Sequence, residues 1–387
     1  MRNFIYDNST IIIFGKDTEK QIGIETKKYG KKVLLHYGGG SIKRSGLYDQ
    51  VISSLKEENV EYLELGGVLP NPRLSLVREG IKLVKENQID FILAVGGGSV
   101  IDSAKAISIG AKYDKDVWDF FDNNVKIKDA LPIGVILTLP AAGSETSHSC
   151  VITNEKGWYK RSAASVLERP KFAIMNPELT FTLPNYQTAS GATDMIAHVM
   201  ERYFTNEKDV EFTDQLCEAT IRVIIDKVKI CLKDNNNYSA RAELMWAGTI
   251  AHNGLLGTGR IEDWASHGIE HELSGIYDIT HGAGLAIIFP AWMKYVYKHD
   301  LKRFARFANK IFDIKINKNN LSETALKGIK KLEEFFQEIN MPITLKEVNI
   351  SNERFNEMAL KATENGKIGN FVKLGTEDVK NILKLSI

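Results

Sequence analysis

The spacing of hydrophobic residues changes once along the chain, and this change constrains the fold more than any other feature. Up to about residue 184, short apolar and β-branched runs alternate with amphipathic stretches of helical period. Near-continuous apolar strands separated by helices are typical of a parallel sheet that is covered on both faces. We therefore predict an α/β fold for this half, with strands at residues 33–37, 62–65, 91–95 and 133–137.

The second half of the chain lacks strand signals and consists of successive long helical patterns. A first helix is predicted through Tyr203, with Asn185 as its N-cap, because apolar residues recur every three or four positions. No internal repeat of about 20 to 50 residues is visible, which excludes a solenoid. The predicted fold is an α/β N-terminal domain, residues 1–184, followed by an all-α C-terminal domain, residues 185–387.

Charge and cysteine content exclude several classes of function. Lys and Arg number 50 against 49 Asp and Glu, so no basic excess indicates a nucleic acid partner or an anionic membrane. The three cysteines form no CxxC pair, and their odd number argues against a disulfide framework. No run of about 18 apolar residues and no signal-peptide core is present. We expect a cytoplasmic protein whose partners are small molecules rather than nucleic acid or membrane.

Two GGGS segments follow predicted strands in the first half, at residues 38–41 and 96–99. Open α/β sheets bind ligands at the carboxyl ends of their strands, and glycine lets backbone N–H groups approach a phosphate. The pair of segments therefore predicts a dinucleotide site, although the GxGxxG fingerprint is absent. The alternative is that both are simply tight turns between a strand and a helix.

The first of these segments also bears on the choice of cofactor. No acidic residue stands between His36 and Ser45 to accept the ribose 2′-hydroxyl of NAD, and Ser41, Lys43 and Arg44 stand there instead. A hydroxyl with cationic neighbours suits the 2′-phosphate, so we predict a preference for NADP(H), with NAD(H) as the alternative. The alternative is that Lys43 and Arg44 simply face water and contact no cofactor.

Histidines cluster in the helical half together with one aspartate. Asp194 and His198 are four residues apart on a predicted helix, and so are His267 and His271, while His281 follows ten residues later. A carboxylate with imidazoles suits one divalent Fe²⁺ or Zn²⁺ and lacks the all-oxygen shell that Mg²⁺ or Ca²⁺ prefers. Spacing alone leaves open which of the last three histidines are ligands, whether the metal is iron or zinc, and whether the site is catalytic or structural.

Four sequence blocks occur in a fixed order: GGGSVIDSAK at 96–105, TLPAAGSE at 138–145, GATDMIAH at 191–198, and HGIEHEL from 267 running on to HG at 281. In order and spacing they resemble the iron-containing (group III) alcohol dehydrogenases, and most of all their butanol-dehydrogenase-like branch. The resemblance spans most of the chain. It implies a dehydroquinate-synthase-like fold, a cleft that holds cofactor and metal between two domains, and a homodimer.

The resemblance also implies roles for individual residues. The metal ligands would be Asp194, His198, His267 and His281, with iron as the first expectation and zinc as the alternative, and His271 would be catalytic, beside nicotinamide and substrate. Many relatives have Thr where Ala142 stands here, which puts a hydroxyl contact at that position in doubt. Cofactor contacts would fall on Gly38, Gly39, Gly40, Ser41, Asn71, Gly97, Gly98, Ser99, Asp102, Thr138, Leu139, Ser144, Ser147 and Lys160.

The activity implied is hydride transfer between NAD(P)H and a primary alcohol or aldehyde such as butanol or butanal. The metal would act as Lewis acid, and His271 would relay the proton. One rival is a lyase of the dehydroquinate-synthase type, which would need a phosphate-binding cluster around the metal. A glycerol-dehydrogenase-like enzyme is a second rival, although such relatives usually lack this set of one aspartate and three histidines. A protein that binds metal or nucleotide without catalysis is the third.

Overall fold

The computed structural model describes residues 1–122 and 125–387, which form two compact units. The sheet unit comprises residues 7–183 and 235–253, and the helical unit comprises residues 1–6, 184–234 and 254–387. The main division therefore falls between Leu183 and Pro184. Two segments cross it, because the first six residues pack with the helical unit and residues 235–253 pack with the sheet unit.

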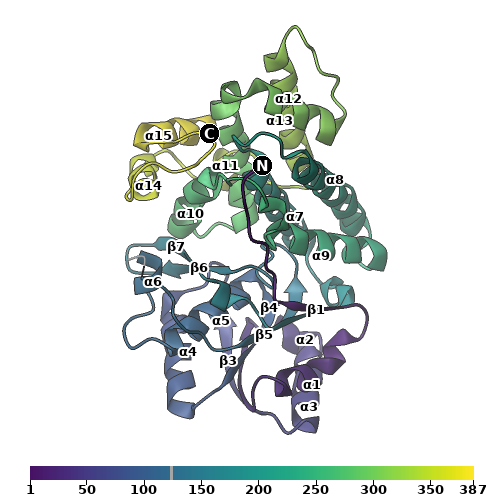
Figure 1. The fold of residues 1–387 in the computed structure, drawn as a ribbon, viewed down its shortest axis with the longest axis vertical. Helices are drawn as coiled ribbons and strands as arrows, with labels where there is room; N and C mark the ends of the chain where they lie inside the picture. Colours follow the sequence, from purple (N-terminus) through teal and green to yellow (C-terminus); the bar gives the residue numbers. More distant parts are fainter. Residues whose placement is uncertain (123–124) are drawn as a thin grey trace. The chain divides into compact units, whose positions relative to one another are not determined.

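The sheet unit is built on a parallel sheet with the strand order β1-β8-β5-β4-β2-β3 (Figure 1). The predicted strands lie inside β2, β3, β4 and β5. The edge strand β1 and its neighbour β8 were not predicted. The strand bounds are β1 Ile11–Phe14, β2 Lys32–Gly38, β3 Glu61–Val68, β4 Phe91–Gly97, β5 Ile133–Leu139 and β8 Phe172–Met175.

Alternate residues of the central strands enter two separate hydrophobic cores. On one face Val33 and Leu35 of β2 pack with side chains of α1 (Ile22–Lys27) and α3 (Leu47–Glu57). On the other face Leu34 packs with α4 (Leu74–Asn87) and α5 (Gly98–Ala111). Because both faces are covered, these strands read as continuous apolar runs in the sequence.

The direction of the connections reverses between β2 and β4. From β2 the chain passes through α2 (Ser41–Arg44) and α3 to β3 on one side, whereas from β4 it passes through α5 and α6 (Asp119–Asp122) to β5 on the other. Such a switch point leaves room between neighbouring connections at the carboxyl ends of the strands. The two GGGS segments follow the two strands that flank this point.

A hairpin and one helix complete the sheet unit. Strands β6 (Ser149–Asn154) and β7 (Tyr159–Ala164) pair antiparallel, and neither was predicted. Helix α9 (Tyr238–His252) packs in this unit, where the Thr249 hydroxyl donates a 2.6 Å hydrogen bond to the buried Glu145 carboxylate. The histidine at position 252 therefore belongs to the sheet unit and not to the helical one.

The helical unit is arranged around α7 (Asn185–Tyr203), whose residues 188–203 are all buried. Its N-cap is Pro184, so the prediction that Asn185 caps the helix was wrong by one residue; proline fixes its own φ near the value found here and favours a helix start. The other helices are α8 Glu211–Lys233, α10 Ala265–Tyr277, α11 His281–Val296, α12 Leu301–Phe312, α13 Leu321–Glu338, α14 Phe355–Ala362 and α15 Thr376–Leu385.

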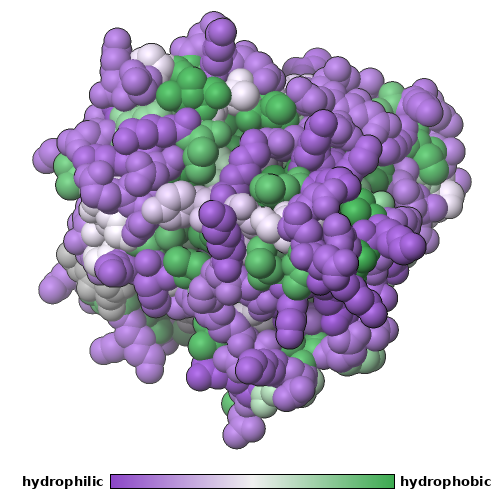
Figure 2. Space-filling model, turned by 90° about the horizontal axis from the view of Figure 1, so that it is seen from above, coloured by the Kyte–Doolittle hydropathy of each residue, from purple (hydrophilic) through white to green (hydrophobic). Residues whose placement is uncertain are grey.

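Hydrophilic side chains dominate the face of the molecule shown in Figure 2, and hydrophobic side chains occur there in small separate groups. Scattered apolar residues of this kind are normal on protein surfaces. Among the helices of the described residues, none has both the length and the apolar character that crossing a membrane requires.

Candidate functional site

Helices α7, α10 and α11 carry the predicted metal ligands. Asp194 and His198 lie one turn apart on α7, both 4% exposed, with His198 Nδ1 3.1 Å from Asp194 Oδ1. His267 lies in the first turn of α10, and His281 is the first residue of α11. Two of the predicted ligands thus lie on adjacent turns of one helix, and the other two lie near the N-termini of two further helices. Regular helical backbone fixes the direction in which each side chain leaves its helix.

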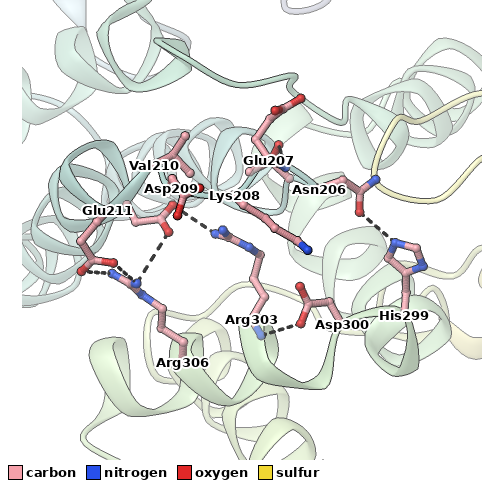
Figure 3. Close-up of a pocket in the computed structure, with 12 residues that line it drawn as sticks. Asn206, Glu207, Lys208, Asp209, Val210, Glu211, His299, Asp300, Arg303 and Arg306 are labelled. Carbon is pink, nitrogen blue, oxygen red and sulfur yellow. Dashed lines mark hydrogen bonds and ion pairs between the residues drawn. The ribbon is translucent and has the colours of Figure 1, made fainter. Parts of the chain in front are cut away.

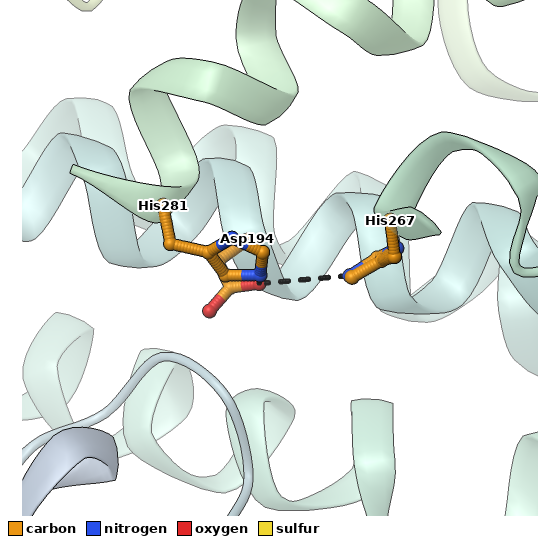
Figure 4. A group of neighbouring side chains, drawn as sticks. All are labelled: Asp194, His267 and His281. Carbon is orange, nitrogen blue, oxygen red and sulfur yellow. Dashed lines mark ion pairs between the residues drawn. The ribbon is translucent and has the colours of Figure 1, made fainter. Parts of the chain in front are cut away.

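Three of these side chains converge on one point. His281 Nε2 is 3.6 Å and His267 Nε2 is 4.0 Å from Asp194 Oδ1 (Figure 4). One ligand atom from each of the three side chains lies within 4.8 Å of the other two, a spacing that suits a shared ion. His198 lies beside this group, with its ring centroid 4.7 Å from that of His267.

The chemistry of these side chains fits a divalent metal ion. His198 Nδ1 hydrogen-bonds the backbone oxygen of Asp194 at 3.0 Å, so in the described part of the chain Asp194 Oδ1 and His267 Nε2 are buried yet have no hydrogen-bond partner. Buried polar atoms are rarely left without partners, because the loss of their hydration costs about 1 to 3 kcal/mol. One carboxylate oxygen with imidazole nitrogens is also a donor set that iron and zinc both accept.

Two buried glutamates orient the histidines, and neither was predicted from the sequence. Glu201 Oε1 accepts hydrogen bonds from His267 Nδ1 at 2.7 Å and from its backbone N–H at 3.0 Å. Glu270 accepts a short hydrogen bond from His281 Nδ1. A carboxylate on Nδ1 holds a histidine in the tautomer that leaves Nε2 available to a metal. Spacing in the sequence could have indicated them, since Glu201 lies seven residues after Asp194 on α7 and Glu270 lies three residues after His267 on α10. Both spacings place the two side chains on one face of a helix.

Protonation states in this cluster also suit metal binding. Burial raises the pKa of Asp194, but the neighbouring histidines lower it further, so the net pKa lies well below the usual range. Burial, His198 and His281 lower the pKa of His267 well below its usual value. An ionised aspartate and a neutral histidine are the forms that bind metal. Burial also raises the pKa of Glu201 to about 7.

His271 is half-buried on α10, and its ring centroid lies 5.7 Å from that of His281. With Glu270 and His281 it forms a second group whose ligand atoms are close together. The group of Asp194, His267 and His281 is the better metal site, because Glu270 already accepts the Nδ1 proton of His281. This leaves His271 at the border of the cluster.

In the sheet unit, the predicted cofactor residues gather at one edge of the sheet. Strands β2, β4 and β5 are neighbours and parallel, so their carboxyl ends lie together. Gly38 ends β2 and is followed by Gly39, Gly40 and Ser41; Gly97 ends β4 and is followed by Gly98 and Ser99; Thr138 and Leu139 end β5. A Cβ on Gly39 would meet no atom within 4 Å, so the protein leaves open space at this glycine.

A buried lysine ties the segment 144–149 to α5. Lys105 Nζ donates to Ser144 Oγ at 3.0 Å, to the Ser147 carbonyl at 3.0 Å and hydroxyl at 3.1 Å, and to the Ser149 carbonyl at 2.9 Å. Ser144 in turn donates to Asp102 Oδ1 at 2.5 Å. The predicted contacts Asp102, Ser144 and Ser147 thus belong to one network, and Lys105, read earlier only as part of a motif, joins them.

Two further predicted contacts pair with each other beside the hairpin. Lys160 Nζ on β7 donates a 2.9 Å hydrogen bond to Asn71 Oδ1, and both residues are buried. Asn71 has a φ of 53°, in the left-handed region that asparagine tolerates better than most residues. This pairing fixes the turn between β3 and α4.

The helical unit also contains an open cavity of about 540 Å³ lined by none of the clustered ligands (Figure 3). Its arginines are matched by carboxylates: Arg303 donates to Asp214 at 3.1 Å, and Arg306 donates to Glu211. Because these arginines pair with carboxylates of the wall and none of the clustered histidines lines the cavity, we do not consider it a candidate site.

Comparison with known families covers almost the whole chain. Residues 9–177 match the family described as iron-containing alcohol dehydrogenase. Residues 188–387 match the C-terminal part of the same family. The first match corresponds to the sheet unit up to its last strand, and the second to the helices that carry the aspartate and histidines.

Individual relatives match along their full length. A probable NADH-dependent butanol dehydrogenase 2 of Bacillus subtilis (strain 168) is 47% identical, with all of both chains covered. An NADPH-dependent aldehyde reductase of Escherichia coli (strain K12) is 36% identical over 95% of this chain and 94% of its own. A crystal structure of NADH-dependent butanol dehydrogenase A from Thermotoga maritima has a TM-score of 0.96 at 42% identity, covering 100% of this chain and 99% of that one.

Fold and sequence together define an oxidoreductase of the alcohol dehydrogenase type. The chain belongs to the iron-containing alcohol dehydrogenase family. This confirms the predicted family, the predicted fold class of an α/β domain followed by helices, and the predicted class of enzyme.

Proposed function

We propose that this enzyme transfers a hydride between a nicotinamide cofactor and a primary alcohol or aldehyde, with butanol and butanal as representative substrates. The cluster of Asp194, His267 and His281, with two buried atoms that lack hydrogen-bond partners, carries the proposal. The printed names of the relatives support it, since they include butanol dehydrogenases and an aldehyde reductase.

The metal would be held by Asp194, His198, His267 and His281, with Fe²⁺ as the proposed ion and Zn²⁺ as the alternative. When bound, the ion would supply Lewis acidity to the substrate oxygen and the reduced nicotinamide would supply the hydride. The protein itself orients the ligand side chains before the metal binds. Glu201 and Glu270 hold two of the histidines in place, because each carboxylate accepts a hydrogen bond from a histidine Nδ1.

His271 is proposed to relay the proton that the alcohol loses or the alkoxide gains. His271 is not fully buried on α10, and its ring centroid lies 5.7 Å from that of His281. An imidazole with a pKa near 6.5 is suited to such a transfer at neutral pH. Replacement of His271 by Ala should therefore slow turnover and keep the metal, whereas replacement of His281 by Ala should lose the metal. The opposite pattern would exchange the two roles.

For the cofactor we propose a preference for NADP(H), with NAD(H) also accepted. The cationic side chains of Lys43 and Arg44 after the first glycine segment support this, while the names of the relatives divide between NADH and NADPH. Comparison of kcat/KM for NADPH and NADH tests the preference, and a tenfold advantage of NADH would overturn it. We further propose that the enzyme is a cytoplasmic homodimer, which light scattering of the purified protein and cell fractionation would test.

The deciding experiment measures NADPH and NADH consumption with butanal. The protein is first stripped of metal and then reloaded anaerobically with Fe²⁺ or with Zn²⁺. Activity that returns only with metal supports the proposed reaction and identifies a competent ion. No turnover with either ion, either cofactor or several aldehydes would instead favour a lyase or a binding protein.

A further inference from the structure

A glutamate and two tyrosines surround the lysine that follows the first glycine segment. Lys43 Nζ lies 3.6 Å from Glu64 Oε2, and 5.0 Å and 4.6 Å from the ring centroids of Tyr37 and Tyr48. The tyrosine hydroxyls donate to the same carboxylate, Tyr37 at 2.9 Å and Tyr48 at 2.5 Å. The ammonium is therefore held by one full charge and two aromatic faces.

This group stands beside the proposed nucleotide site. Leu35 of β2 pairs with Glu64 of β3, so Glu64 shares a face of the sheet with Tyr37, two residues further along β2. Tyr37 directly precedes Gly38, and Lys43 lies in α2 immediately after the glycine segment. The carboxylate is thus close to the place where a ribose 2′ substituent would meet cations that follow β2.

Glu64 is an ionised carboxylate whose two oxygens are each held by a tyrosine hydroxyl. Partial burial raises its pKa, but the hydrogen bonds of the tyrosines and the charge of Lys43 lower it further, below its usual value. The group is therefore ionised at neutral pH. Both of its oxygens already accept tyrosine hydroxyls. The carboxylate can therefore attract Lys43 and repel a nearby phosphate. Both interactions extend over about 10 Å at 0.1 M salt.

We propose that Glu64 is a specificity-determining residue that restrains Lys43 and so limits how strongly the enzyme prefers a cofactor with a 2′-phosphate. This inference rests on the proposed function, because it assumes that the nucleotide ribose lies at the first glycine segment. Arg44, the neighbouring cation, forms no ion pair with Glu64 among the described residues and serves as the internal comparison. The sequence alone shows two cations at positions 43 and 44, whereas the structure shows that one of them is already paired.

Binding of nucleotide fragments tests the inference without any turnover. Calorimetry on the metal-loaded enzyme would compare adenosine 2′,5′-bisphosphate with adenosine 5′-monophosphate. Replacement E64Q should tighten the bisphosphate about tenfold and change the monophosphate less than about twofold, because only the former carries the added charge. Glu61→Gln, an exposed acid earlier on β3, is the matched control and should change neither.

A double-mutant cycle identifies the partner of Glu64. Lys43→Gln should weaken bisphosphate binding little in the wild type but about tenfold in the E64Q background, since only there is the ammonium released. Arg44→Gln should weaken it equally in both backgrounds. The inference would be overturned if E64Q raised the affinity for both nucleotides equally or for neither. It would also be overturned if Lys43→Gln changed bisphosphate affinity by the same factor in the wild type and in E64Q.

The same data separate this inference from the proposed reaction. If E64Q bound only the bisphosphate more tightly but no variant turned over aldehyde, the role of Glu64 would stand and the proposed reaction would be overturned. If neither nucleotide binds the wild type or any variant, the inference falls together with the proposed nucleotide site.

Discussion

The cluster in the helical unit and the glycine segments in the sheet unit are built in opposite ways. Asp194, His267 and His281 form a site out of side chains, each held by a helix and, for the histidines, by a second carboxylate. At the edge of the sheet, the proposed nucleotide site consists of backbone, and Gly39 leaves open space there. The first site should therefore fail when atoms are removed, and the second when atoms are added.

One buried carboxyl of the sheet unit also differs from the two buried glutamates beside the histidines. In the helical unit the buried glutamates at positions 201 and 270 each accept a hydrogen bond from a histidine Nδ1. In the sheet unit Glu168 is fully buried, and within the described residues neither of its carboxyl oxygens has a hydrogen-bond partner. A hydrogen-bond donor offsets part of the pKa increase that burial causes, and burial raises the pKa of Glu168 to about 8 against about 7 for Glu201.

The largest effect is expected when a ligand atom is removed from the side-chain site. Asp194→Asn replaces a buried anionic oxygen with a neutral amide, so we expect metal affinity and aldehyde turnover to fall by roughly 1,000-fold or more. Elemental analysis after dialysis and steady-state kinetics would measure both. Asp226→Asn, an exposed aspartate on α8, is the matched control and should keep full metal content. An Asp194→Asn enzyme that retained stoichiometric metal would contradict this comparison.

A smaller loss should follow when the supporting carboxylates are changed. Glu270→Gln and Glu201→Gln leave every proposed ligand in place but remove the anionic acceptors of the Nδ1 protons, so metal affinity should fall by about 10- to 100-fold. Competition with a chelator of known affinity would measure the change. Glu272→Gln is a sharp control, because this buried carboxylate on the same helix pairs with Lys361 at 3.6 Å instead of a histidine. Equal losses in all three variants would indicate a general effect of buried charge.

The sequence predicted the parts of each region that depend on a repeating pattern. The strands β2, β4 and β5 are buried on both faces and stood out as apolar runs, and the spacing of four residues brought Asp194 and His198 together on α7. The four-residue strands β1 and β8 were missed. Strand β1 is exposed at both ends, β8 is only a brief apolar stretch, and the hairpin strand β7 alternates with polar residues.

Residues whose role comes from burial could not be predicted in the same way. Glu201, Glu270 and Lys105 are ordinary charged residues at helical positions, and charged residues usually face water. Only the packing of α7 against α10 and α11, and of α5 against the 144–149 segment, shows that these three are enclosed and hydrogen-bonded. For the same reason the sequence gives no indication that Lys43 is paired with Glu64, which lies 21 residues further along the chain.

At the backbone site the informative change adds atoms. Gly39→Val introduces a side chain where the protein itself leaves open space, so the melting temperature should stay within about 1 °C while nucleotide affinity falls by roughly tenfold. Calorimetry with AMP and a thermal melt would measure the two. Gly375→Val, at the start of α15 in the helical unit, should leave nucleotide affinity unchanged. An undiminished affinity in the Gly39 variant would mean that the nucleotide does not approach this segment.

The smallest effect concerns the pH dependence of stability and comes from Glu168. Burial raises its pKa to about 8, against 4.5 for an unperturbed glutamate, although the nearby Lys105 lowers it in part. The folded state therefore binds more protons than the unfolded state between these values, and the free energy of unfolding falls as pH rises through this window. Glu168→Gln removes the titrating group, so its melting temperature relative to wild type should be a few degrees higher at pH 8 than at pH 5.

Thermal melts of both proteins at several pH values would measure this difference. A carboxyl that gains a partner, such as Glu211 beside Arg306, has its pKa lowered and would give the opposite slope, so Glu211→Gln is the useful counterpart. A constant difference between the Glu168 variant and wild type across pH would mean that the residue titrates normally. The Glu168 carboxylate would then be compensated at least as fully as the glutamates beside the histidines, and this contrast would disappear.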